Sequence, residues 1–167
     1  MNQFDPQITG LMEGEVTGLT VIDPQPFVGG TGNHVIDPSK EFTLKVELEV
    51  FGQLVPIWLA ALGGNWDVSV YAESLGGGSE VRLGTELVAT TDTRPCTVNQ
   101  AQANCTKYEA TVTVPAGKLE EHTPGTDQGG IYKLVAAVFL NSDLPGTPGY
   151  DLVGFSEGPI IQAEVPA

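Results

Sequence analysis

The stretch 154–158 (Gly-Phe-Ser-Glu-Gly) has the G-x-S-x-G spacing of a hydrolase serine nucleophile. That motif requires a strand before the serine, a helix after it, and a histidine further along the chain that acts as the base. Here Pro159 follows the motif directly, and no histidine lies beyond Ser156. We therefore predict a turn that leads into the last strand. A serine hydrolase acting through Ser156 ranks third among the functions considered.

The two histidines, His34 and His122, lie in predicted loops beside Gly, Pro or Thr residues. A histidine base needs a nucleophile within hydrogen-bonding reach, and the sequence places no Ser or Cys against either ring. We predict that both histidines lie at the surface. With no convergent catalytic set in the sequence, we predict no catalytic residue and no enzyme activity.

Four acids, in or next to predicted loops, could gather at one end of the domain: Asp127, Asp143, Asp151 and Glu157. Calcium takes six to eight oxygen ligands, so carboxylates gathered at a loop end could bind it. The regular D-x-D-x-D-G calcium loop is absent. We therefore predict no cofactor and no metal ligands, and keep calcium as an alternative.

Cys96 and Cys105 lie nine positions apart in one polar loop, with no further candidate metal ligand nearby. This spacing permits a disulfide, and we predict that the two cysteines form one; free thiols in a reducing cytosol are the alternative. The first ten residues lack the basic start and apolar segment of a signal peptide. Localisation therefore stays open: extracellular if the cysteines are bonded, cytoplasmic otherwise.

The chain has 167 residues and a formal charge of −14, with only seven Lys and Arg residues, which do not cluster. Nucleic acids and anionic membrane surfaces are poor partners for such a protein, because both need basic patches. No window approaches the ~18 apolar residues of a membrane span, so we predict no membrane insertion.

Apolar and polar residues alternate in segments typical of half-exposed strands, most clearly over 41–50, 65–72 and 107–114. Further strands are expected over 16–22, 81–89 and 158–165. Turn residues separate the segments, and none has the period of an amphipathic helix. The pattern predicts an all-β fold, an antiparallel β-sandwich of about seven to eight strands. We expect residues 1–14 to form a flexible lead-in and residues 15–167 to form a single domain.

The segment 131–140 is the longest nearly uninterrupted apolar run, and Lys133 is its only charge. Its even-numbered residues from Tyr132 to Leu140 would line one face, and Ile131, Val135, Ala137 and Phe139 the other. Because both faces are apolar, we predict a central strand that is covered on both sides.

Three short patterns resemble those of immunoglobulin-like and fibronectin-III-like sandwiches. Trp66 in NWDVSVYA is placed like their core Trp, GIYKLVA (130–136) is similar to their sixth strand, and YEATVTV (108–114) to their fifth. Antibody domains have a Cys where this chain has Leu134, so their inter-sheet disulfide is absent. The resemblance implies an immunoglobulin-like architecture and no function.

The segment 54–62 (LVPIWLAAL) is apolar all round and contains Pro56, which argues against a central strand. We expect a short helical turn or an irregular crossover. Its apolar residues must be covered, either by the open end of the sandwich or by another chain. The interface candidates are Leu54, Ile57, Trp58 and Leu59; the competing interpretation is that Trp58 plugs its own sandwich.

From these patterns we predict a non-catalytic structural or binding module that acts through its surface as a component of a protein assembly. A protein partner or self-association would cover the excess apolar sequence. The alternative is a carbohydrate- or calcium-binding domain whose site uses Tyr71, Tyr150 and the loop acids.

Overall fold

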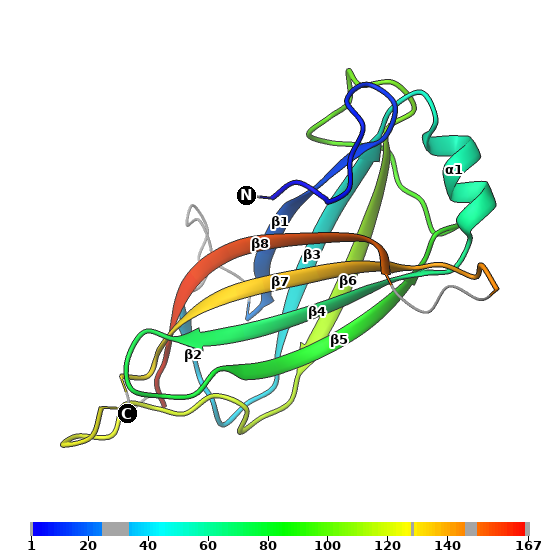
Figure 1. Cartoon of the computed structure of the whole chain (residues 1–167). Coiled ribbons are helices and arrows are strands. Elements are labelled where there is room, and N and C mark those ends of the chain that lie inside the picture. The colour runs from blue at the N-terminus through cyan, green and yellow to red at the C-terminus, as the bar shows by residue number, and fades with distance from the viewer. Residues whose placement is uncertain (1, 25–33, 128, 146–149, 166–167) are drawn as a thin grey trace.

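The computed structural model describes residues 2–24, 34–127, 129–145 and 150–165, and these residues form two packed β-sheets and one short helix (Figure 1). The smaller sheet has the strand order β1 (Glu13–Asp23), β3 (Phe42–Phe51), β6 (Thr106–Val114). The larger sheet has the order β2 (Val35–Ile36), β8 (Tyr150–Ala163), β7 (Ile131–Asn141), β4 (Asn65–Ser74), β5 (Val81–Ala89). The chain is therefore an all-β sandwich of eight strands in its described part, as the sequence predicts.

Alternate residues of each strand fill the space between the sheets, which follows from the two-residue period of a β-strand. The inward residues of β3 are at most 2% exposed: Phe42, Leu44, Val46, Leu48 and Val50. Trp66 of β4 is fully buried in the core, and its ring centroid lies 5.4 Å from that of Tyr108. The prediction of which side chains of these strands point into the core is confirmed.

Residues before β1 contact the sandwich rather than extend away from it. Phe4 is buried, and its ring stacks on Trp66 with the centroids 5.6 Å apart. The backbone of Asp5 exchanges two hydrogen bonds with that of Val153 on β8. The segment expected as a lead-in thus supplies part of the core. The domain boundary predicted at residue 14 stays a prediction.

One strand pair departs from the antiparallel arrangement that the sequence predicts. β2 runs parallel to β8, with Val35 opposite Gln162 and Ile36 opposite Ala163. More than a hundred residues separate the two strands in the chain, so no hairpin dictates their relative direction. The other strand pairs among the named strands are antiparallel.

The stretch 154–158, predicted as a turn, lies inside β8, and that prediction is wrong. Its glycines are explained by packing across the sandwich rather than by a turn. A Cβ on Gly154 would overlap the ring of Phe4, and one on Gly158 would lie 2.5 Å from Leu19 Cδ2. Only glycine permits these close approaches. Both glycines therefore belong to β8, which begins eight residues earlier than expected.

The apolar segment after β3 forms a helix, α1 (Val55–Leu62), at one end of the sandwich (Figure 1). Pro56 lies in the first turn, where its missing N–H costs no helical hydrogen bond. Gly63, at a φ of 60°, ends the helix and donates its N–H to Leu59 O. Val55 and Leu62 are buried and fix the helix to the core.

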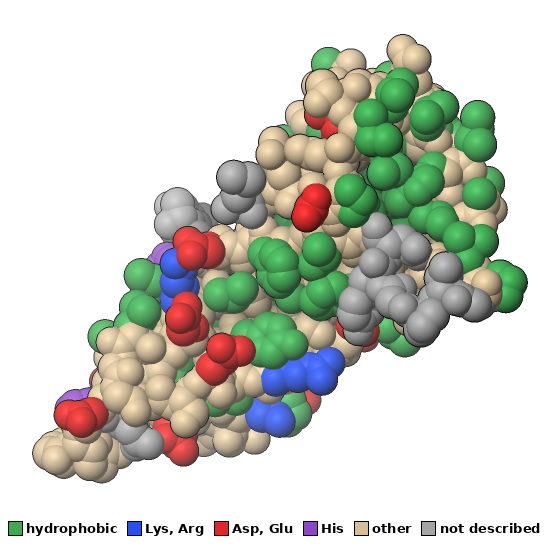
Figure 2. Space-filling view, in the orientation of Figure 1, with side chains coloured by type: hydrophobic (Ala, Val, Ile, Leu, Met, Phe, Trp, Pro, Cys, Tyr) green, Lys and Arg blue, Asp and Glu red, His purple; other side chains and the backbone are tan. Residues whose placement is uncertain are grey.

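The outer faces of the two sheets differ in character. On the smaller sheet, the buried Lys107 ammonium pairs with Glu47 and, at 3.0 Å, with Glu109. On the larger sheet, apolar side chains gather over the middle strands (Figure 2).

Strand β7 is central in the larger sheet, between β8 and β4, but only one of its faces is covered. Its residues from Tyr132 to Leu140 at even positions are at most 5% exposed. On the other face, Ile131 is 42% exposed, and Val135 and Phe139 are half-buried. The prediction of a strand covered on both sides is therefore wrong for the described structure, because α1 sits at the end of the sandwich and forms no third layer.

Candidate functional site

The first candidate surface is the α1 patch, defined as Leu54, Ile57, Trp58 and Leu59. Ile57 is 70% exposed and Leu54 is 44% exposed. The helix has no acidic residue in its first turn and no basic residue in its last. The patch is thus apolar at the outer surface of a strongly acidic protein, and hydrophobic side chains cover this end of the molecule in Figure 2.

The four residues of the α1 patch divide between core and solvent. Trp58 and Leu59 are partly buried and pack against the core, so they help to close the end of the sandwich. Leu54 and Ile57 point outward. The partial burial of Trp58 fits the interpretation that it plugs its own sandwich, whereas a contact of Ile57 with another chain stays a prediction.

The backbone around α1 is held on both sides by neighbouring segments. At its start, Leu54 N–H donates to Leu11 O at 2.9 Å. At its end, Asp143 N–H donates to Leu62 O, and the Asp143 carboxylate accepts the Gly64 N–H at 2.9 Å. The α1 patch is therefore presented on a fixed scaffold, which reduces the conformational entropy that the patch itself would lose on binding a partner.

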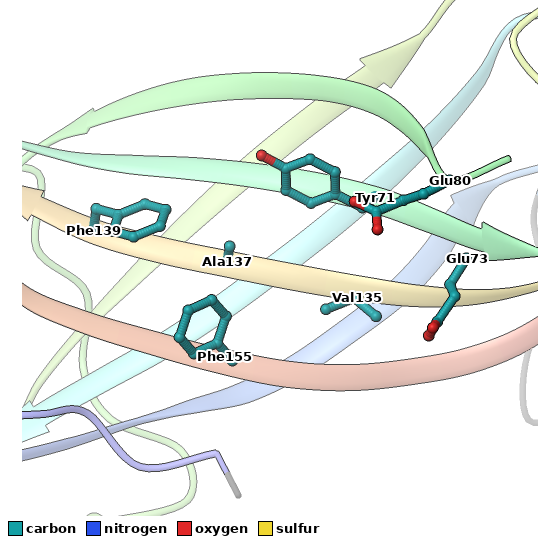
Figure 3. A pocket seen from close by; sticks show the side chains of 7 residues that line it. All are labelled: Tyr71, Glu73, Glu80, Val135, Ala137, Phe139 and Phe155. Atoms are coloured by element: carbon teal, nitrogen blue, oxygen red, sulfur yellow. The ribbon is translucent and has the colours of Figure 1, made fainter.

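The second candidate surface is the sheet hollow, a depression of about 410 Å³ on the outer face of the larger sheet (Figure 3). Its walls are aromatic: Tyr71 of β4, Phe139 of β7 and Phe155 of β8. The Phe139 and Phe155 rings meet edge to face, with centroids 6.2 Å apart. Val135 and Ala137 form the floor. Phe155 is 51% exposed, so a large aromatic surface is open to a ligand.

Two carboxylates complete the lining of the sheet hollow. Glu73 extends from β4, and Glu80 lies just before β5. In Figure 3 they lie toward one end, Phe139 and Phe155 lie toward the other, and Tyr71 lies between. Within the described ranges, neither Glu73 nor Glu80 takes part in an ion pair.

Other charged groups on this face lie around the sheet hollow. Lys133 pairs with Glu157 at 2.6 Å, and Arg82 donates to Ser69 Oγ at 3.2 Å and also to Thr85. Asp67 lies opposite Phe139 in the strand register. Its Oδ1 is buried, and no group in the described part of the chain donates a hydrogen bond to it.

The remaining residues that the sequence singled out do not converge on one site. Ser156 is 5% exposed on the inner face of β8, and its Oγ lies 3.4 Å from the Glu157 carbonyl oxygen. His34 Nδ1 instead lies 3.0 Å from Ile160 O. A buried serine that faces the core cannot meet a substrate, so the geometry gives no support to a nucleophile elbow.

The loop acids do not gather as the calcium alternative requires. Asp143 contacts Gly64 before β4 begins, whereas Asp127 O accepts the Gly77 N–H beyond the end of β4. A ten-residue strand is roughly 30 Å long, so these two acids cannot share an ion. The side chains of Tyr150 and Asp151 lie outside the described residues.

Cys96 and Cys105 form a disulfide, as predicted, with Cα atoms 5.9 Å apart. The Glu49 carboxylate lies near both sulfurs, and this trio could hold a metal ion only if the disulfide were reduced.

Glu49 fastens the disulfide loop to β3. The carboxylate is fully buried and accepts the backbone N–H groups of Thr97, Val98 and Asn99 at 2.6, 3.0 and 2.7 Å. Burial raises the pKa of Glu49, but these hydrogen bonds outweigh burial and hold the pKa below its ordinary value. The carboxylate is therefore charged at neutral pH and acts as a structural anchor.

Comparisons with known proteins give no family. No family model matches the chain, and none of the curated proteins matches it. Among solved structures, a bacterial adhesin from Mobiluncus mulieris containing intramolecular disulfide, isopeptide and ester bond cross-links aligns with a TM-score of 0.39 and 13% identity. The alignment covers 90% of this chain and 56% of that one. A likeness of this degree defines neither the fold nor the function of the chain.

The sequence indicates the residues of the α1 patch and, for the alternative carbohydrate or calcium site, Tyr71 of the sheet hollow, but it does not predict the rest of the hollow. The two-sided apolar pattern of 131–140 is the sequence signal for the hollow, because an apolar outer face indicates either burial or a binding surface. Across the described ranges, no helix combines the length and apolar character needed to cross a membrane.

Proposed function

We propose that this protein is a non-catalytic binding module that docks a partner protein through the α1 patch. The observation that carries the proposal is Ile57, which is 70% exposed on a helix without a charged residue. An aliphatic residue beside a partly buried Trp is the composition expected at the centre of a protein interface.

The partner is a protein less acidic than this chain, rather than a second copy. Each copy has a formal charge of −14, so two copies repel one another. A neutral partner avoids this repulsion, and a basic partner is attracted by the same field, which also increases its rate of association.

The architecture supports an immunoglobulin-like assignment for this module. The order β1-β3-β6 against β5-β4-β7-β8-β2 resembles strands A-B-E packed on C′-C-F-G, with β2 added beside the last of these. Tyr132, near the start of β7, donates its hydroxyl to Glu120 O at 3.0 Å and accepts the Glu120 N–H. This contact resembles the tyrosine corner that such sandwiches form at the start of their sixth strand, and it supports the proposal. The Cys96–Cys105 disulfide supports an oxidising, extracellular setting.

The test compares Ile57→Glu with Leu75→Glu. Both replace an exposed aliphatic residue with a carboxylate, and Leu75, 53% exposed, lies beyond the far end of β4 from α1. Immobilised wild-type protein and both variants are incubated with extract of the source cells, and bound proteins are quantified by mass spectrometry. We expect a protein retained by the wild type and by Leu75→Glu but lost with Ile57→Glu, and its purified form must bind in the same order.

Light scattering on the isolated wild type provides the second arm. We expect a monomer. A dimer that dissociates on Ile57→Glu substitution would contradict the choice of partner, and equal retention of every protein by both variants would contradict the use of the α1 patch.

A further inference from the structure

We propose that the sheet hollow is a second binding site, which takes the arginine side chain of a polypeptide. Three aromatic side chains and two carboxylates line it, and they come from three neighbouring strands and the residue before a fourth: Tyr71, Glu73, Glu80, Phe139 and Phe155. The site lies on the outer face of the larger sheet, away from the α1 patch, and does not depend on it.

Aromatic faces beside carboxylates favour an organic cation. The π face of an aromatic ring attracts a cation within about 6 Å of its centroid, and Tyr71 and Phe155 present such faces to solvent. Glu73 and Glu80 supply the opposite charge at one end of the hollow. A hydrocarbon ligand would leave these carboxylates without a partner, and an anion would be repelled by them.

The charge balance of the outer face of the larger sheet also favours a cation. Four carboxylates lie on or beside the hollow: Asp67, Glu73, Glu80 and Glu157. The cations Lys133 and Arg82 are engaged, Lys133 with Glu157 and Arg82 with the Ser69 and Thr85 hydroxyls. Asp67 Oδ1 takes no hydrogen bond from the described residues. The face therefore has a surplus of negative charge beside exposed apolar walls.

Arginine fits this surface better than lysine does. Its planar guanidinium stacks on aromatic rings and presents several N–H groups to carboxylates, whereas an ammonium is a compact, strongly hydrated charge. The arginine stem would lie along Val135 and Ala137, as long cationic side chains do on apolar surfaces. Exposed Ile160, 52% accessible on the same face of β8, offers a contact for a neighbouring residue of the peptide. This favours a polypeptide over a free small cation.

The experiment is an NMR titration of the ¹⁵N-labelled protein with the capped tripeptide acetyl-Gly-Arg-Leu-amide. The matched probe is the same tripeptide with citrulline, which has the shape of arginine but no charge. We expect the arginine peptide to shift the amide signals of Val135, Ala137 and Phe139, and the citrulline peptide to bind at least about threefold more weakly. Equal binding of both peptides would overturn the proposal, as would shifts confined to other parts of the molecule.

Variants separate the site from the general acidity of the protein. Glu73→Gln/Glu80→Gln should weaken binding by about threefold or more, and Glu41→Gln/Glu86→Gln, which removes the same charge at exposed positions elsewhere, should not. Phe155→Ala should also weaken binding without unfolding, since Phe155 is 51% exposed. Equal losses in the two double variants would overturn the proposal.

Tetramethylammonium chloride tests the other source of a cation. If it shifts the same signals and the arginine peptide does not, the site is for a free quaternary ammonium and the proposal is wrong. None of these titrations requires the partner of the α1 patch, so failure here leaves the proposed function standing, and the converse also holds.

Discussion

The Glu49 carboxylate offers the sharpest test of how this fold is held together. It accepts hydrogen bonds from three consecutive backbone N–H groups and from the Asn99 side chain at 3.1 Å, while fully buried. Glu49→Gln keeps the shape of the side chain but turns one acceptor oxygen into an NH₂ group. If that group replaces Oε2, it faces the Asn99 N–H and Nδ2, so two donors lose their acceptor.

The magnitude follows from these lost bonds. A buried donor left without an acceptor costs about 1–3 kcal/mol, and the exposed loop lets water recover part of that. We expect Glu49→Gln to lower the free energy of unfolding by about 2 kcal/mol in urea denaturation at pH 7 without reductant. Glu86→Gln, at an exposed position, should change it by less than about 0.5 kcal/mol.

The stability that Glu49 contributes should depend on pH. The pKa of Glu49 is lower in the folded protein than its ordinary value of 4.5, so the anchor contributes stability above that value. This contribution is lost as the pH falls through the folded pKa, and the difference between wild type and Glu49→Gln should shrink there. A loss under about 0.5 kcal/mol at pH 7, or a difference that grows on acidification, would refute the anchoring role.

Two further predictions concern buried Tyr108 and the disulfide. Burial raises the pKa of Tyr108 to about 12, so its contribution to stability is complete below pH 10 and is lost as the pH rises from 10 toward 12. Denaturation at pH 8 and pH 11 should show this loss of stability in the wild type and a smaller loss in Tyr108→Phe. An equal loss in the two proteins would contradict the prediction. Protein purified without reductant and then denatured should contain no titratable thiol, and two thiols would show that Cys96 and Cys105 are not bonded in solution.

The alternation of apolar residues was enough to predict the sandwich and the facing of its long strands. β3, β4 and β6 have one apolar and one polar face, so the period of two determines which side chains meet in the core. The start of β8 could not be predicted in this way. Gly154 and Gly158 resemble turn residues in the sequence, and only the positions of Phe4 and Leu19 show that they serve close packing.

The sheet hollow could not be predicted for the same reason, because it depends on contacts between distant parts of the chain. The sequence shows that Val135, Ala137 and Phe139 share one face of a strand, but not whether another layer covers that face. Phe155 reaches the hollow through the β7–β8 register, which places it opposite Ala137. Such cross-strand neighbours are distant in sequence and follow no local period. The α1 patch was more accessible to prediction because its residues are contiguous.

The central claim, docking of a less acidic partner through the α1 patch, is tested most directly by the dissociation constant of the purified partner for Ile57→Glu and Leu75→Glu. Both variants add one negative charge, so general electrostatics cancels in the ratio. The account predicts that Ile57→Glu weakens binding at least about tenfold while Leu75→Glu binds like the wild type. Equal dissociation constants for the two variants would contradict it.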